Sequence, residues 1–287
     1  MEVFNVLQRI VPLRQNSSMP FPELIHTKHK ITSVHLARPA ELEIFIPAGL
    51  IGNERLNLLL LNDGQDVEGL GLAETLVSLY GKNQIEALVV VAIQASAARL
   101  QEYGVAGKPD FMGRGAQAQG YTDFIVQELI PFVEANVNMP IKGKRAFAGF
   151  SLGGLSAFDI AWNNDTHFDA VGVFSGSFWW RSKDLKDHYT DRDRIMHQRI
   201  EESKGKPELE FWLMTGTEDE LADRNKNFII DSIDDTVDLI KELLKKGYDR
   251  AADIAYYEMV GGKHELETWA KVLPAFLCWA FGTKRFL

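Results

Sequence analysis

Residues 145–154, Arg-Ala-Phe-Ala-Gly-Phe-Ser-Leu-Gly-Gly, decide the fold of this 287-residue chain. Within them, Gly149-Phe150-Ser151-Leu152-Gly153 matches the pattern G-x-S-x-G. An apolar stretch of strand length precedes the match and a helical pattern follows it, which is the context that the motif requires. The flanking glycines let a sharp strand-to-helix turn close without steric clash. The alternative interpretation is a glycine-rich turn that carries no chemistry.

Ser151 is therefore the candidate nucleophile. The helix that begins after the turn directs its free N-terminal N–H groups toward the serine. The N–H of Leu152 is thus well placed to stabilise an oxyanion.

Working outward, short apolar stretches alternate with helical patterns. The apolar stretches are mostly continuous, as in parallel strands buried on both faces, so we expect an α/β fold with a central, mostly parallel sheet and helices on both faces. The expected strands are 56–61, 87–93, 145–149, 170–174, 210–215 and 253–259. The expected helices are one that starts at Thr122 or Asp123 and is bent by Pro131, and those over 151–162, 228–246 and 265–281.

The N-terminal part departs from this alternation. Residues 31–36 and 41–46 flank Ala37-Arg38-Pro39-Ala40 and predict a hairpin that forms an antiparallel edge of the sheet. We interpret residues 1–287 as a single domain, with 1–30 as an N-terminal extension. Residues 181–208 are highly charged and interrupt the rhythm, so we expect there a solvated helical excursion or a lid over the site.

Composition limits the classes of partner. The chain has 31 Lys and Arg against 40 Asp and Glu, a net charge of −9, with no basic cluster interleaved with aromatics, so nucleic acid is a poor candidate. No stretch approaches the roughly 18 apolar residues of a membrane span, and the N-terminus lacks a signal-peptide pattern. The single cysteine, Cys278, cannot form an intramolecular disulfide. We expect a cytoplasmic protein; the oligomeric state is not readable from the sequence.

A G-x-S-x-G turn in an alternating α/β pattern is typical of the α/β-hydrolase fold, in which the acid and the histidine follow the serine along the chain. Among seven histidines, His264 alone follows the last expected strand and precedes the last helix, and we interpret it as the general base. The acid belongs in the loop after residues 210–215, where Glu218, Asp219 and Glu220 all qualify and Asp223 is a more distant alternative.

The loop after strand 56–61 is the expected source of a second oxyanion donor. It reads Asn62-Asp63-Gly64-Gln65-Asp66, in which Gly64 allows close backbone approach, so the N–H of Gln65 is the candidate. Residues 62–66 are equally typical of an ordinary turn without a catalytic role. A calcium loop would need further ligands at set spacing and a closing Glu, so we expect no metal.

With these motifs in place, the chain resembles the esterase D and enterochelin-esterase-like branch of the α/β hydrolases over roughly residues 30–285. The landmarks are 61–66, 149–154, 174–180, 216–219 and 261–264 with Trp269. The resemblance implies that Asp219 is the catalytic acid and that Gln65 supplies the oxyanion N–H.

The resemblance also implies an ester substrate without any cofactor. Phe178, Trp179 and Trp180 are similar to a stretch of enterochelin esterases, which indicates an aromatic or bulky ester, although these rings equally suit packing. Arg99, Arg114 and Arg181 are available for an anionic group, and we list Arg99 with the substrate-binding candidates. Siderophore, feruloyl, acetyl-xylan and S-formylglutathione esters fit the family, the last least well. An acyltransferase and a non-catalytic binding protein of the same fold are the alternatives.

Overall fold

The computed structural model describes residues 9–11, 23–50, 55–137 and 139–284, and within these ranges the strands form one nine-stranded sheet. Its order is β1-β2-β3-β5-β4-β6-β7-β8-β9. β4 to β9 are all parallel to one another, whereas β1, β2 and β3 form an antiparallel edge. The strands are β1 (Arg9–Val11), β2 (Leu24–Ser33), β3 (Arg38–Pro47), β4 (Asn57–Asn62), β5 (Leu88–Ile93), β6 (Arg145–Phe150), β7 (Ala170–Phe174), β8 (Glu210–Glu218) and β9 (Ile254–Lys263).

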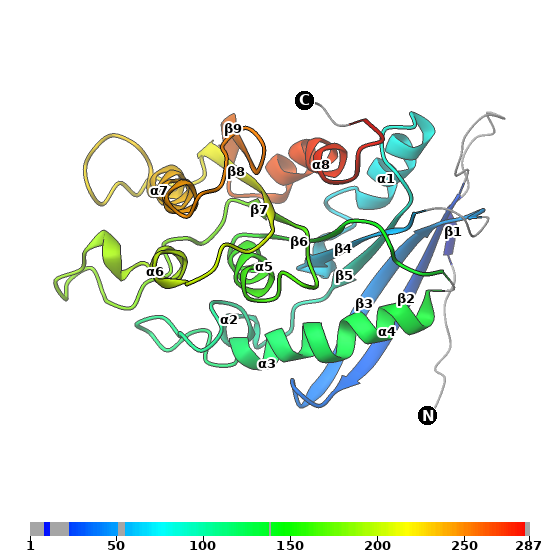
Figure 1. The fold of residues 1–287 in the computed structure, drawn as a ribbon, viewed down its shortest axis with the longest axis horizontal. Helices are drawn as coiled ribbons and strands as arrows, with labels where there is room; N and C mark the ends of the chain where they lie inside the picture. Colours follow the sequence, from blue (N-terminus) through cyan, green and yellow to red (C-terminus); the bar gives the residue numbers. More distant parts are fainter. Residues whose placement is uncertain (1–8, 12–22, 51–54, 138, 285–287) are drawn as a thin grey trace.

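Helices cover both faces of the sheet, which confirms the expected architecture (Figure 1). α1 and α8 pack on one face, and α3 to α5 with α7 pack on the other. The helices are α1 (Leu72–Gly81), α2 (Arg99–Glu102), α3 (Ala118–Asp123), the π-helical turn η2 (Phe124–Leu129), α4 (Ile130–Asn136), α5 (Leu152–Asn163), α6 (Ile195–Glu202), α7 (Asp231–Lys245) and α8 (Leu266–Phe281), with 3₁₀ turns η1 (Gly64–Asp66) and η3 (Asp191–Asp193).

Burial on both faces explains the continuous apolar runs. Every residue of β4, β5 and β7 is buried, because each of these strands has a neighbour on either side and helices above and below. α5 is likewise buried along all but its last residue. These elements place the hydrophobic core directly beneath the loops that follow the parallel strands.

The N-terminal hairpin exists, but its position in the sequence was predicted wrongly. The turn occupies residues 34–37, with Ala37 at φ 51°, and Pro39 pairs with Thr32 inside the strands. Proline is tolerated there because β3 pairs with β5 only over residues 42–45, so the end that carries Pro39 lies at an open edge. Residues 24–30, expected in the N-terminal extension, belong to β2; residues 1–8 and 12–22 lie outside the described residues.

Two helix starts were also predicted wrongly. The helix expected at Thr122 or Asp123 begins at Ala118, and the Thr122 hydroxyl donates to the Ala118 carbonyl oxygen at 3.0 Å instead of capping. The helix accommodates Pro131, which cannot donate a backbone hydrogen bond, through the π-helical turn η2 just before it. α7 begins at Asp231, three residues after the expected start, because Lys226 and Phe228 have φ of 59° and 70°, which is incompatible with a right-handed helix.

The charged segment 181–208 is anchored at its C-terminal half. Ile195, Met196 and Ile200 of α6 are buried, and α6 packs on α7. Most residues from 182 to 192 are exposed. The segment thus contains a packed helix preceded by a solvated stretch. Across the described part of the chain, no helix is both long enough and apolar enough to cross a membrane.

Gly172 in the middle of β7 tests how tightly the sheet packs on α8. A Cβ at this position would lie 2.7 Å from Cζ of the buried Phe276 and 3.0 Å from the Ala148 Cβ. Gly172→Ala is therefore expected to lower the free energy of unfolding by about 1–3 kcal/mol in urea titrations. Gly205→Ala, which meets no atom within 4 Å, is the control and should change it by less than about 0.5 kcal/mol.

Candidate active site

The carboxyl ends of the parallel strands bring the sequence-predicted residues to one edge of the sheet. Ser151 follows β6, Asp219 follows β8 and His264 follows β9. The loop with Gln65 follows β4, and Arg99 begins α2 at the end of the loop after β5. Because parallel strands end at the same edge, five loops from distant parts of the chain meet there.

Ser151 has a strained backbone. Its φ of 53° and ψ of −123° lie outside the regions that L-residues normally occupy. The neighbouring loop holds it in place: the Ser151 N–H donates to the Phe174 carbonyl oxygen at 2.9 Å, and the Ser177 N–H donates to the Ser151 carbonyl oxygen at 3.1 Å. The Ser151 Oγ lies 3.3 Å from the Oγ of Ser177. A serine with this strained backbone at a strand-to-helix turn is the arrangement that the G-x-S-x-G motif provides for a nucleophile.

Glycine is required on both sides of the serine. A Cβ on Gly149 would press against the Gly153 carbonyl and come within 2.8 Å of the Gly154 nitrogen. A Cβ on Gly153 would lie 2.5 Å from Oδ2 of Asp63, in the loop after β4. The motif therefore lets α5 approach both its own strand and the neighbouring loop.

The two expected oxyanion donors stand at the starts of helical turns. Leu152 is the first residue of α5 and Gln65 the second of η1, positions whose N–H groups have no partner within the helix. Among the described residues, neither the Leu152 N–H nor the Gln65 N–H donates to a backbone oxygen outside its helix. The loops that carry them are joined, since the Asn62 side-chain amide donates to the Gly153 carbonyl oxygen at 2.8 Å.

Arg99 holds the loop of Gln65. Its Nε and Nη2 donate to the Asp63 carboxylate at 2.6 and 2.8 Å, and its guanidinium lies 5.0 Å from the centroid of the Tyr103 ring. Asp63 has φ 60°, and its N–H faces the Tyr103 hydroxyl at 3.3 Å. The structure thus engages the proposed substrate-binding arginine in a bidentate ion pair that fixes the turn before Gln65.

His264 lies beside Trp269 of α8. The two rings meet edge to face at 5.2 Å, and Trp269 also stacks on Phe150 at 5.0 Å, next to Ser151. The Trp269 Nε1–H donates to the Ser175 Oγ at 3.0 Å, which fixes the indole. Trp269 is therefore the physical link between the loop of the histidine and the turn of the serine.

Loss of water around the ring lowers the pKa of His264 below its ordinary value of 6.5. The negative charge of Asp219 acts in the opposite direction, and the positive charge of Arg99 lowers the pKa further. The net effect favours the neutral imidazole, which is the form that accepts a proton.

Asp219 is the acidic residue whose surroundings suit a catalytic acid best. Its Oδ2 accepts hydrogen bonds from the Gly216 N–H at 3.0 Å and the Ser232 hydroxyl at 2.9 Å. Its Oδ1 is buried and has no hydrogen-bond partner among the residues that the structure describes. A carboxylate held through one oxygen, with the other left open, is suited to accept an imidazole N–H.

The alternative acids have other surroundings. Glu218 is exposed at the end of β8, opposite Lys263. Asp223 accepts the N–H groups of Asn227 and Phe228 within its own loop. Burial raises the pKa of Glu220, and the nearby carboxylate of Asp231 raises it further.

The hydrogen bonds that would connect Ser151, His264 and Asp219 are not formed among the described residues of this structure. Among the described residues, no hydrogen bond joins the His264 ring to Ser151 or to Asp219. Catalytic hydrogen bonds are often long without substrate and tighten when it binds. The placement after β6, β8 and β9 and the Trp269 contacts are what bring the three loops together.

The aromatic residues after β7 divide into two groups. Phe178 and Trp180 are fully buried in the core and do not face solvent, so packing accounts for them. Trp179 is partly exposed, with the Arg114 guanidinium 5.0 Å from the centroid of its ring. Arg114 is itself paired with Asp110. Of the three rings, only Trp179 is open to a ligand.

Sequence reasoning missed several residues that support the site. Ser177, Ser232 and Tyr103 make hydrogen bonds to Ser151, Asp219 and Asp63 respectively. The residues in each pair are at least 13 positions apart, so no local sequence pattern predicts the contact. Trp269 was noticed only as a family landmark, and its ring contacts with His264 and Phe150 give this position a structural role.

A family model described as "Esterase: Putative esterase" matches residues 33–280. Solved structures of similar fold include the enterobactin esterase of Shigella flexneri, crystallised in the presence of 2,3-dihydroxy-N-benzoyl-glycine, at a TM-score of 0.65 and 20% identity over 92% of this chain and 60% of that one. This chain therefore spans about 60% of the length of that esterase.

Two further structures match over nearly their whole length. A ferulic acid esterase gives a TM-score of 0.67 at 15% identity and covers 90% of this chain and 97% of its own. A siderophore hydrolase of Aspergillus nidulans gives 0.65 at 16% identity and covers 93% and 97%. At these identities the structures establish a shared α/β-hydrolase fold.

The surroundings of His264 predict its titration. In an NMR titration of the histidine rings, with His264→Ala used for assignment, the His264 midpoint should lie below 6.5. Asp219→Asn removes the negative charge that raises this pKa, so the midpoint should fall further. An unchanged midpoint in Asp219→Asn would show that the carboxylate does not act on the ring.

Proposed function

The chain belongs to the Esterase family, and on that premise we propose that it hydrolyses a carboxylic ester through Ser151, His264 and Asp219. The observation that carries the proposal is the backbone of Ser151, strained at the end of β6 with the free N–H of Leu152 beside it. Strain at a buried turn persists where function needs it.

The proposed mechanism proceeds through an acyl-enzyme. The Ser151 Oγ attacks the ester carbonyl carbon while His264 takes its proton, and the N–H groups of Leu152 and Gln65 stabilise the oxyanion. His264 then gives the proton to the departing alcohol oxygen as the C–O bond breaks. Water, deprotonated by His264, hydrolyses the acyl-enzyme in the same way. Asp219 orients the imidazole and stabilises its protonated form.

An ester with an aromatic acyl group is the substrate class that we favour. Trp179 is a partly exposed ring on the loop whose Ser177 Oγ lies 3.3 Å from Ser151 Oγ. Two proteins of the same fold are a ferulic acid esterase and an enterobactin esterase crystallised with a dihydroxybenzoyl compound. Ferulic acid is an aromatic acid, and the dihydroxybenzoyl compound carries its aromatic ring as an amide on nitrogen; a tryptophan face is a suitable surface for either ring.

Replacing the three residues tests the proposed mechanism. With 4-nitrophenyl acetate and a 4-nitrophenyl benzoate, Ser151→Ala and His264→Ala should lower kcat by at least about a thousandfold, and Asp219→Asn by at least about a hundredfold. Glu218→Gln, which removes the exposed neighbouring carboxylate, is the matched control and should retain kcat within about twofold. Normal turnover by Ser151→Ala would refute the mechanism.

The same experiment separates the alternative functions. A fluorophosphonate probe should label the wild type and not Ser151→Ala, because the reagent needs an activated serine. Absence of wild-type labelling would favour a non-catalytic binding protein. Addition of acceptor alcohols should leave hydrolysis dominant, whereas mostly transesterified product would identify an acyltransferase.

A further inference from the structure

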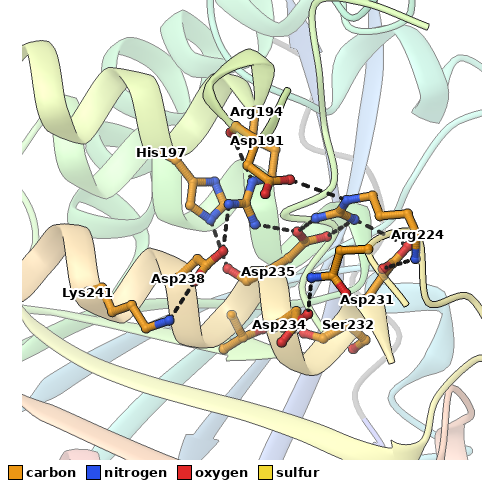
Figure 2. A network of polar contacts seen from close by, with 12 residues as sticks. Asp191, Arg194, His197, Arg224, Asp231, Ser232, Asp234, Asp235, Asp238 and Lys241 are labelled. Carbon is orange, nitrogen blue, oxygen red and sulfur yellow. Dashed lines mark hydrogen bonds and ion pairs between the residues drawn. The ribbon is translucent and has the colours of Figure 1, made fainter. Parts of the chain in front are cut away.

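Two arginines share one buried aspartate behind the catalytic edge (Figure 2). Asp235 of α7 is 1% exposed, and its carboxylate accepts from Arg194 at 2.6 Å. The two terminal nitrogens of Arg224 donate to the same carboxylate, one of them at 3.0 Å. Arg194 stands before α6, whereas Arg224 lies in the loop between β8 and α7 that begins with Asp219.

Arg224 is tied to α7 by its backbone as well as its side chain. Its N–H donates to the Asp231 Oδ1 at 2.9 Å, and the Asp231 N–H donates to the Ala222 carbonyl oxygen at 2.8 Å. Asp231 opens α7, and Asp235 lies one turn further along the helix. Residues 222–224 are thus fastened to the first two turns of α7.

The next residue of α7 holds the other end of the loop. Ser232 donates its hydroxyl proton to the Asp219 Oδ2 at 2.9 Å. The first turn of α7 therefore grips the loop at Asp219 and again at Arg224, five residues later. We expect that loss of either contact, at Ser232 or at Asp231, would reorient the Asp219 carboxylate and move its Oδ1.

Removing these charged groups from water costs free energy, so a gain in the stability of the fold does not by itself explain the network. Asp235 and Arg194 are 1% and 4% exposed, and buried ion pairs are often no better for stability than apolar residues of similar volume. What a forked ion pair provides is a fixed geometry, because a guanidinium binds a carboxylate in one plane. The geometry fixed here is that of the loop that carries Asp219.

We infer that Arg224, clamped by Asp235, is a positioning residue that holds the Asp219 loop on α7 so that the free Oδ1 of Asp219 stays available to the His264 ring. The inference rests on the proposed role of Asp219 as the acid. Arg194 uses the same Asp235 but fastens α6, so it marks the structural part of the network.

Arg224→Lys tests the inference, since lysine keeps the charge but not the fork. With 4-nitrophenyl acetate, kcat should fall about tenfold while KM stays within about twofold. Arg194→Lys is the matched control: it disturbs the same carboxylate, and its kcat should stay within about twofold whatever its melting temperature. Both are assayed below their melting temperatures, and Arg224→Gln replaces Arg224→Lys if the latter does not fold. Equal kcat in the Arg224 and Arg194 variants would overturn the inference.

A double variant identifies the route of the effect. In an Asp219→Asn background, Arg224→Lys should reduce kcat by less than about twofold further, because the residue through which it acts is already lost. An undiminished tenfold loss in that background would overturn the inference alone. Wild-type kcat in Asp219→Asn by itself would remove Asp219 from the proposed function, and the inference with it.

Discussion

The first turn of α5 must lie directly on the end of β6, and the rest of the site depends on that contact. The absence of side chains at Gly149 and Gly153 lets the helix start immediately after the strand, so that Ser151 occupies the corner between them. The same absence at Gly153 admits Asp63 from the neighbouring loop, which carries Gln65. The proposed nucleophile and the proposed oxyanion donors are thus positioned by one steric condition, and the sheet supplies the rigid support beneath them.

Positive charge near this edge is used mainly to hold loops. Arg99 fixes the turn at Asp63, Arg114 is paired with Asp110, and Arg224 is clamped by Asp235. In each pair the aspartate is less than a tenth exposed, so the ion pair acts where water screens it least. The −9 net charge of the chain therefore coexists with a proposed active-site edge at which these arginines are paired with aspartates.

The sequence was sufficient for the architecture and for the placement of Ser151, Asp219 and His264 after the parallel strands β6, β8 and β9. Continuous apolar strands, the G-x-S-x-G turn and the position of His264 after the last strand are local patterns, and each depends on residues adjacent in the chain. The choice of Asp219 over its acidic neighbours needed the family resemblance, since Glu218, Asp219 and Glu220 are three consecutive carboxylates that present the same local signal.

What the sequence could not give depends on distant partners. The turn of the hairpin was misplaced because strand pairing across β1, β2 and β3, not Pro39, decides where it lies. Trp179 and Trp180 are adjacent in sequence, yet Trp179 is partly exposed whereas Trp180 is fully buried, because the Trp180 ring packs against the distant Gly104 and Gly115. The ion pair of Arg99 with Asp63, 36 residues away, has no local signal in the sequence, and the role of Arg99 in substrate binding stays a prediction.

Three neighbouring strands end in residues with left-handed backbones: Asp63 after β4, Ser151 after β6 and Ser175 after β7, with φ of 60°, 53° and 49°. None is glycine, so each raises the conformational energy of the native state. The enzyme thus concentrates its backbone strain along the rim where reaction is proposed, and the buried sheet below offsets it. Such a protein has room to gain thermostability by relaxing that rim, at the expense of turnover.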